Sequence, residues 1–205
     1  MRLMILFLLS LLLSACGRDQ EPAGPPPAAS VILPLASGNS WTYQVISLDT
    51  AGQQHVGGMM LSVGRDTLFG GERWFGLFPG SWSANRPDGV WQREGEGAPY
   101  LFWRFPASAG DSYPVGGDSM TVLSTYQSVA VPHGVHICHV YRQGSDTYYY
   151  LAPLVGLVKM ELYSPAGLTV LSLAAMTLHG PEVSGDPSAF PPPGLPGTPV
   201  FRTLE

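Results

Sequence analysis

The chain has 205 residues, of which 45% are hydrophobic and 12% are charged, and its formal net charge at pH 7 is −5. The charged fraction is about half of the usual ~25%, and a nucleic-acid-binding protein needs a basic surface to neutralise phosphates. We therefore expect one domain of ordinary size and no nucleic-acid partner. The 25 Gly and 20 Pro interrupt the chain throughout, which is typical of many short strands joined by tight turns and argues against long helices.

The N-terminus carries one cation, Arg2, and then an apolar stretch over residues 3–13 that only Ser10 interrupts. As a helix this stretch would rise roughly 16 Å, about half of the ~30 Å hydrocarbon core of a bilayer. It is too short to span a membrane, and its layout is typical of an export signal.

The four residues that close this signal, LSAC, resemble the lipobox of bacterial lipoproteins. The resemblance implies cleavage after Ala15, which removes residues 1–15, transfer of diacylglycerol to the Cys16 sulfur, and acylation of the new amino terminus. The alternative is an ordinary secretory signal whose cysteine happens to lie at the cleavage site. Two or three acyl chains hold a protein stably at a membrane, whereas one chain holds it only marginally.

The anchor also indicates a location. An acidic body gains no affinity from anionic lipids, so the acyl chains on Cys16 must supply the attachment. Gly17 follows the cysteine, where Asp would resemble the inner-membrane retention signal of enteric bacteria. We expect a protein of the cell envelope, on the outer membrane if the organism has two membranes.

Both ends of the remaining chain are poor in side chains that could pack. Residues 16–33 hold the lipidated cysteine and a Pro-rich linker whose 17 residues after Cys16 would reach roughly 50 Å at about 3.1 Å per residue. Residues 180–205 contain seven Pro and four Gly, which predicts a disordered tail. The folded body is then residues 34–179.

Alternation of apolar and polar residues predicts a body made of short strands. Connections this short favour antiparallel neighbours, and about ten twisted antiparallel strands must curl, close or split. We therefore predict an all-β single domain whose antiparallel sheet is strongly curved, as a half-barrel or a barrel-like sheet. The predicted strands are residues 40–48, 56–63, 73–78, 89–93, 100–105, 119–124, 127–131, 135–142, 147–151, 155–163 and 168–178.

One segment occurs twice. Residues 34–41, PLASGNSW, match residues 106–113, PASAGDSY, in the positions of Pro, Gly, Asn or Asp, Ser and the aromatic residue. In each copy Gly and the Asx residue are expected to form a turn, and the aromatic residue is expected to begin a strand on the buried face. The repeat raises the possibility that the body consists of two similar halves.

Four elements resemble those of a broad set of uncharacterised bacterial lipoproteins and exported proteins: GNSWTYQV at residues 38–45, FPASAGDSY at 105–113, VAVPHGVHICHV at 129–140, and YYLAPLVGLVKME at 149–161. The set has similar GNSWTY, GDSW, VPAGTF and YYAPGVGLVK elements in this order, and the likeness covers roughly residues 34–163. The elements imply a shared fold and no catalytic role. This chain departs from the set at His133, where Ala is usual, and at Leu154, where Gly is usual.

A cluster of histidines and one cysteine lies within residues 133–139, but strand geometry argues against a metal site. If residues 135–142 form a strand, His136 and Cys138 point to one face and His139 to the other, so only two ligands converge. We expect no metal and no cofactor. Cys16 is consumed by lipid, so Cys138 has no internal disulfide partner. It should be buried, or in an oxidising compartment it would pair between chains.

The aromatic residues are the strongest candidates for a binding site. Nine of them lie within residues 74–105, and neighbours such as Phe102 and Trp103 must face opposite sides of a strand, so some rings lie off the main core. They either build the core or line an apolar ligand surface. The candidate ligand-binding residues are Trp74, Trp82, Trp91 and Trp103.

The sequence therefore favours a non-enzymatic lipoprotein that binds an apolar or amphipathic ligand, or a partner protein, at the cell envelope. A hydrolase of envelope polymer is the first alternative, with the acid and base supplied by Asp88, Glu94 or Glu96. It requires two of these carboxylates to meet across a cleft. A purely structural envelope module is the second alternative, and it differs in having no enclosed cavity.

Overall fold

The computed structural model describes residues 31–78 and 80–179. Within these residues the chain forms thirteen strands and no helix. The described residues therefore contain no helix that could cross a membrane. The strands are β1 (Ser40–Asp49), β2 (Gln54–Ser62), β3 (Asp66–Phe69), β4 (Glu72–Gly76), β5 (Ser81–Arg86), β6 (Gly89–Glu94), β7 (Tyr100–Arg104), β8 (Ser112–Val115), β9 (Asp118–Val131), β10 (Gly134–Gln143), β11 (Thr147–Ala152), β12 (Gly156–Ser164) and β13 (Gly167–Thr177).

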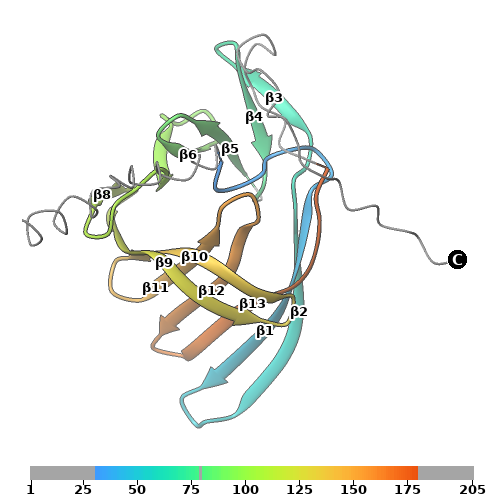
Figure 1. Ribbon diagram of the computed structural model, residues 1–205, viewed down its shortest axis with the longest axis vertical. Coiled ribbons are helices and arrows are strands. Elements are labelled where there is room, and N and C mark those ends of the chain that lie inside the picture. The colour runs from blue at the N-terminus through green and yellow to red at the C-terminus, as the bar shows by residue number, and fades with distance from the viewer. Residues whose placement is uncertain (1–30, 79, 180–205) are drawn as a thin grey trace, which may run out of the picture.

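The strands build two antiparallel sheets. Sheet A has eight strands in the order β2-β1-β13-β12-β11-β10-β9-β8, and sheet B has five in the order β3-β4-β5-β6-β7. Figure 1 shows that sheet A is strongly curled and that sheet B lies over its upper part. Sheet A does not close, because β2 and β8 remain its edges. The predicted all-β fold with a curved antiparallel sheet is confirmed.

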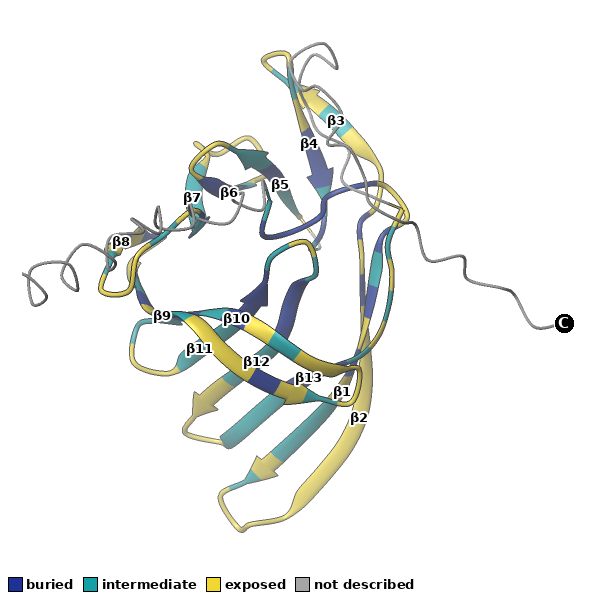
Figure 2. Ribbon diagram, viewed as in Figure 1, coloured by how far each residue is buried: buried dark blue, intermediate teal, exposed yellow. Residues whose placement is uncertain are grey.

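The lower ends of the hairpins in sheet A extend beyond the cover of sheet B, as the exposed colours in Figure 2 show. Leu48 of β1 is 42% exposed, Val56 of β2 is 62% exposed and Tyr163 of β12 is 46% exposed. The main core therefore lies in the upper part of the molecule, between the two sheets.

The sequence pattern missed three strands and divided one. β3 and β8 have only four residues each, too few for an alternating pattern, and β8 carries Pro114, which is tolerated because β8 is an edge strand. β5 reads SWSANR, which has the composition of a loop. The predicted strands 119–124 and 127–131 form one continuous strand, β9, because no Gly or Pro separates them.

The segment before β1 is part of the core, and the linker boundary at residue 33 is corrected accordingly. Ile32 and Leu33 are each 1% exposed. The Leu33 carbonyl accepts a hydrogen bond from Asn85 Nδ2 of sheet B at 2.9 Å, and the Val31 carbonyl accepts one from Leu154 N, between two strands of sheet A, at 3.1 Å. The apolar triplet after the prolines therefore bonds to both sheets, and in Figure 1 this segment runs between them.

Asn39 fixes the end of this segment. Its side chain is completely buried; Nδ2 donates to the Pro34 carbonyl at 2.9 Å, and Oδ1 accepts from His179 N at 2.6 Å. One amide thereby joins the segment before β1 to the residues that follow β13. Buried amides satisfied in this way favour one arrangement of the chain.

The repeated sequence forms the same turn twice. In the first copy Gly38 N donates to the Val63 carbonyl, and Val63 N donates to the carbonyl of Asn39. The second copy has the equivalent pair of bonds between Val122 and the residues Gly110 and Asp111. The two glycines have φ of 91° and 94°, which Gly adopts easily. The repeat is confined to this turn: sheet A takes strands from both ends of the body, so the body is not divided into two similar halves.

Large side chains with bonded polar ends fill the core. Trp41 Nε1 donates to the Val155 carbonyl at 2.6 Å, and the Tyr43 hydroxyl donates to the Leu157 carbonyl at 2.9 Å. The Tyr141 hydroxyl of sheet A donates to the Arg104 carbonyl of sheet B at 2.7 Å. Burial raises the pKa of Tyr43 and Tyr141 far above the usual value, so both remain neutral donors.

The turn between β11 and β12 places Leu154 in a conformation that glycine prefers. Val155 N donates to the Ala152 carbonyl at 3.1 Å, Pro153 is the second residue of the turn, and Leu154 is the third with a φ of 64°. This is the pattern of a type II turn, which requires positive φ at its third position. Leu154 is the only non-glycine residue with positive φ among those that the structure describes.

Replacing Leu154 with Gly should stabilise the protein. The left-handed conformation costs a residue with a Cβ about 1–2 kcal/mol, and the greater freedom of Gly in the unfolded chain offsets about half of that gain, so we expect a net increase of roughly 0.5–1 kcal/mol in the free energy of unfolding. Urea denaturation measures it, with Leu154→Ala as the control that keeps the Cβ. A Leu154→Gly protein less stable than the Leu154→Ala protein would contradict the claim that the backbone at Leu154 is strained.

Candidate functional site

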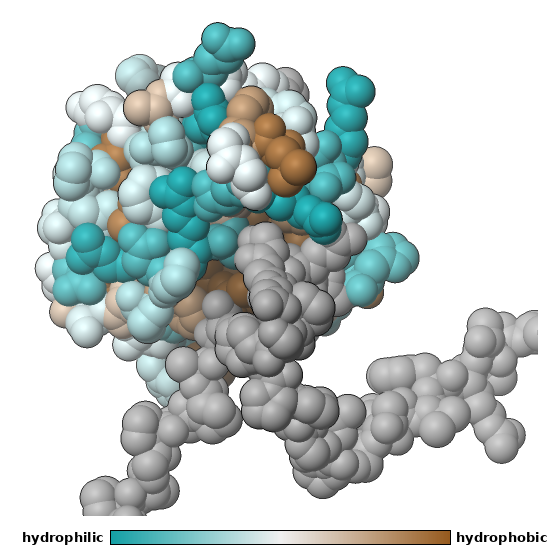
Figure 3. Space-filling view, turned by 90° about the horizontal axis from the view of Figure 1, so that it is seen from above, coloured by the Kyte–Doolittle hydropathy of each residue, from teal (hydrophilic) through white to brown (hydrophobic). Residues whose placement is uncertain are grey.

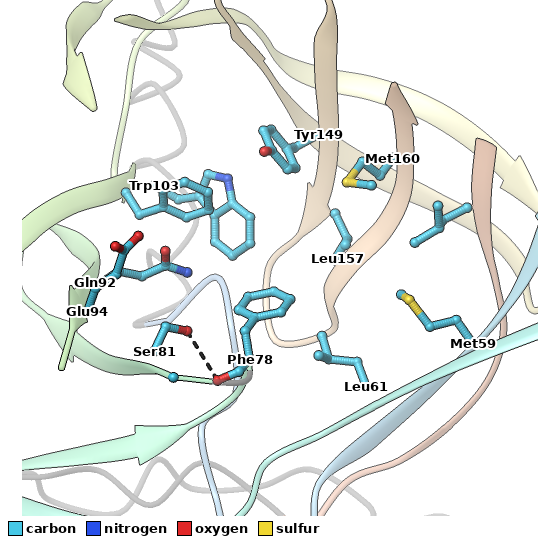
Figure 4. Close-up of a pocket in the computed structure, with 13 residues that line it drawn as sticks. Met59, Leu61, Phe78, Ser81, Gln92, Glu94, Trp103, Tyr149, Leu157 and Met160 are labelled. Carbon is cyan, nitrogen blue, oxygen red and sulfur yellow. Dashed lines mark hydrogen bonds between the residues drawn. The ribbon is translucent and has the colours of Figure 1, made fainter. Parts of the chain in front are cut away.

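A pocket of about 710 Å³ lies between the two sheets, within the ~300–1,000 Å³ range of small-molecule sites. Figure 4 shows its two contrasting sides: polar residues of sheet B lie on one side and apolar residues of sheet A on the other. The lining residues are Met59, Leu61, Phe78, Gly80, Ser81, Gln92, Glu94, Phe102, Trp103, Tyr149, Leu157, Met160 and Leu171.

The wall from sheet A is apolar. Leu157 and Met160 project from β12, and Met59 adds a second methionine from the edge strand β2. Flexible thioether side chains adapt to ligands of varied shape. Tyr149 of β11 contributes its ring, while its hydroxyl donates to Gln143 Oε1 at 2.9 Å; burial raises the pKa of Tyr149 to about 12, so the phenol is neutral.

A bulge in β7 brings two neighbouring aromatic rings to the same pocket. Val90 pairs with Trp103 and Trp91 pairs with Leu101, so Phe102 is an extra residue on β7. The expectation that Phe102 and Trp103 face opposite sides is therefore wrong, because a bulge breaks the two-residue alternation. Both line the pocket, with ring centroids 4.6 Å apart.

Two hydrogen-bond donors in this wall have no partner. Gln92 is 5% exposed and Trp103 is 1% exposed, and neither Gln92 Nε2 nor Trp103 Nε1 donates to any residue that the structure describes. The Gln92 carbonyl oxygen is engaged, since it accepts from the Tyr100 hydroxyl at 3.4 Å. A buried donor without a partner costs about 1–3 kcal/mol, so native proteins rarely keep one without a reason.

The four predicted tryptophans do not gather at one site. Trp103 lines the pocket, whereas Trp91 alternates with Gln92 along β6 and so lies on the outer face of sheet B. Trp82 lies opposite Arg93 in the β5–β6 pairing, on that outer face. Trp74 joins them there, since it also packs against Arg93.

On the outer face the tryptophans stack with arginines. The Arg86 guanidinium lies 4.3 Å from the Trp91 ring centroid and 5.4 Å from that of Trp74, and it bonds both carboxylate oxygens of Glu72 at 2.7 Å. These hydrogen bonds lower the pKa of Glu72. Trp91 Nε1 donates to Asp88 and Trp74 Nε1 donates to Glu72. The indole donors of Trp74 and Trp91 are thus satisfied, in contrast to that of Trp103, and the stack stabilises sheet B.

The histidine and cysteine residues do not converge on one point. His133 and His136 stack with ring nitrogens 3.1 Å apart, while His139 packs against Phe105 elsewhere. Cys138 is completely buried, as expected, and burial raises its pKa to about 12, so it is an inert thiol. In residues 31–78 and 80–179 no three His, Cys, Asp or Glu side chains are placed to hold a metal ion.

The three carboxylates of the hydrolase hypothesis do not meet across a cleft. Asp88 precedes β6 and bonds Trp91, whereas Glu94 ends the same strand, roughly 20 Å away at about 3.3 Å per residue. Glu96 lies on the exposed turn beyond β6. Of the three, only Glu94 lines the pocket, and an acid and base pair is not formed.

Sequence reasoning missed most of the pocket, including Gln92. The signal was present in β6, where Val90, Gln92 and Glu94 alternate with the outward residues, so a polar side chain falls on the buried face. Met59 and Met160 could not have been found, because their proximity depends on the curl of sheet A.

The end of the molecule seen from above in Figure 3 is mostly hydrophilic to neutral, with small separate hydrophobic areas.

Comparison with known proteins gives two structural likenesses. The chain resembles a candidate exported protein with a YmcC-like fold from Bacteroides fragilis, at 14% identity and a TM-score of 0.39. It also resembles a candidate lipoprotein from Parabacteroides distasonis, at 12% identity and a TM-score of 0.41. Each match covers 72% of this chain and 99% of the other. No protein-family model and no curated protein matches the chain.

Proposed function

We propose that this protein is a lipid-anchored cell-envelope lipoprotein that binds an apolar or amphipathic ligand between its two sheets, without catalysing a reaction. The observation that carries the proposal is the pocket of about 710 Å³, whose wall from sheet A is apolar and whose wall from sheet B holds two unpaired donors. Pockets that are mostly apolar with a few polar groups are the usual form of a small-molecule site.

The anchor is proposed from the sequence. The LSAC lipobox at residues 13–16 places diacylglycerol on Cys16 and the folded body outside the cytoplasm, on the outer membrane where the organism has two. A hydrophobic ligand would then reach the pocket from the membrane or from a neighbouring envelope protein.

The alternatives have less support. A hydrolase needs an acid and a base in one cleft, and Asp88, Glu94 and Glu96 are exposed at different places. A purely structural module needs no cavity of this size. In this proposal a partner protein would deliver or receive the ligand. Such a partner could pair with the free backbone groups of β2, which is an edge strand of sheet A.

The anchor predicts a defined modification. The protein isolated from membranes should begin at Cys16 and carry the mass of a diacylglycerol and an additional acyl chain, because the lipobox directs cleavage after Ala15. Mass spectrometry of the intact protein measures both features. Cys16→Ser should leave the leader attached and the mass unmodified. A wild-type protein with free Cys16, or one still carrying residues 1–15, would overturn the anchor.

The pocket predicts site-specific labelling by a hydrocarbon. The full chain in phosphatidylcholine vesicles would be irradiated with a 16-carbon chain that carries a diazirine, and labelled peptides would be mapped by mass spectrometry. We expect labels on β11 and β12, and at least tenfold less label in Met160→Trp, because the indole fills the cavity. Leu162→Trp is the matched control, since Leu162 lies on the same strand outside the lining. Equal labelling in both variants, or none in the pocket, would refute ligand binding there.

A further inference from the structure

We infer that the ligand is a single-chain amphiphile whose head group is uncharged and presents a carbonyl oxygen, such as an acyl ester or amide. This inference rests on the proposed function and adds to it the chemical class of the ligand. It follows from three features of the pocket: its unpaired donors, its charge and the separation of its polar and apolar sides.

The unpaired donors define what the head group must offer. Gln92 Nε2 and Trp103 Nε1 can only donate hydrogen bonds, and neither has a partner among the described residues. Both residues line the cavity. Each donor atom is itself buried, so the side chains must turn slightly for a ligand oxygen to reach it. An oxygen that then accepts from them would remove the cost of two buried, unpaired groups, which gives an acceptor an advantage over a plain hydrocarbon.

The charge of the pocket disfavours an anionic head group. Among the residues that the structure describes, the lining includes the Glu94 carboxylate and no Lys, Arg or His. Burial, and in second place the charge of Glu94, raise the pKa of the neighbouring Tyr100, which shows that the negative charge acts on this wall. A carboxylate or phosphate would meet repulsion with no cation to pair with. Arg93, the nearest cation along β6, lies over Phe69 on the outer face.

The two sides of the cavity match an amphiphile. In Figure 4 Gln92, Glu94 and Ser81 lie on one side, while Leu157, Met160 and Leu61 lie on the other. A head group held by Gln92 would therefore place an acyl chain against the apolar wall of sheet A. Glu94 would remain free to accept a hydrogen bond from a hydroxyl on the same head group.

Competition for the pocket tests the class of ligand. The full chain in phosphatidylcholine vesicles is labelled with the hydrocarbon diazirine probe, and unlabelled glycerol monopalmitate or palmitate is added. We expect the monopalmitate to halve the labelling at a concentration about tenfold lower than palmitate. Gln92→Leu, which removes the donor and keeps the bulk, should abolish this advantage. Trp103→Phe, which removes the indole N–H, should reduce it.

The controls separate folding from recognition. Gln127→Leu and Trp91→Phe make the same chemical changes away from the pocket and should leave the advantage unchanged. Continued labelling of Gln92→Leu by the hydrocarbon probe shows that its cavity is intact. Labelling by the hydrocarbon with equal or better competition by palmitate would overturn the head-group inference alone. Absence of any labelling in the wild-type pocket would overturn the proposed function as well.

Discussion

The fold depends on a short, largely buried segment, residues 31–39, that bonds to both sheets. Its carbonyl at Leu33 accepts from Asn85 of sheet B, and its carbonyl at Val31 accepts from Leu154 of sheet A. Two sheets packed face to face normally fill the space between them with their own side chains at about 10 Å separation. Here Ile32 and Leu33 take part of that space and are almost completely buried, so the segment sets how the sheets meet at one end.

The pocket follows from this arrangement. Sheet A has eight strands and curls without closing, and sheet B covers only its upper part. Next to the segment, the core side chains Trp41 and Tyr43 both have bonded polar ends. None of residues 31–39 lines the cavity, and the bulge at Phe102 brings two rings of β7 to its lining. Gln92 and Trp103, which carry the two donors without a partner among the described residues, both line this cavity.

Local patterns predicted most of the strands and some turns, and failed where distant parts of the chain meet. The turn at Pro87 and Asp88 joins β5 to β6, as its Pro-Asp-Gly sequence indicates, and Cys138 is buried as expected. The bulge that redirects Phe102 has no signature of Gly or Pro, so alternation gave the wrong face. The burial of Ile32 and Leu33 was not predicted. The apolar triplet at residues 31–33 resembles the end of a linker in the sequence, because the residues that it contacts lie more than 50 residues away. The tail at 180–205 and the lipobox lie outside the described residues.

The most direct test of this account compares the two copies of the repeated turn. Asn39 is buried and bonded to Pro34 and His179, whereas Asp111 makes an exposed bond to Ser108 N. Urea unfolding of Asn39→Ala should give a free energy of unfolding lower than wild type by about 2–4 kcal/mol, because the buried Pro34 carbonyl and the partly buried His179 N lose their partners, and Asp111→Ala should lose only about 0.5–1 kcal/mol. Equal losses for the two variants would contradict the claim that the buried segment holds the sheets in place.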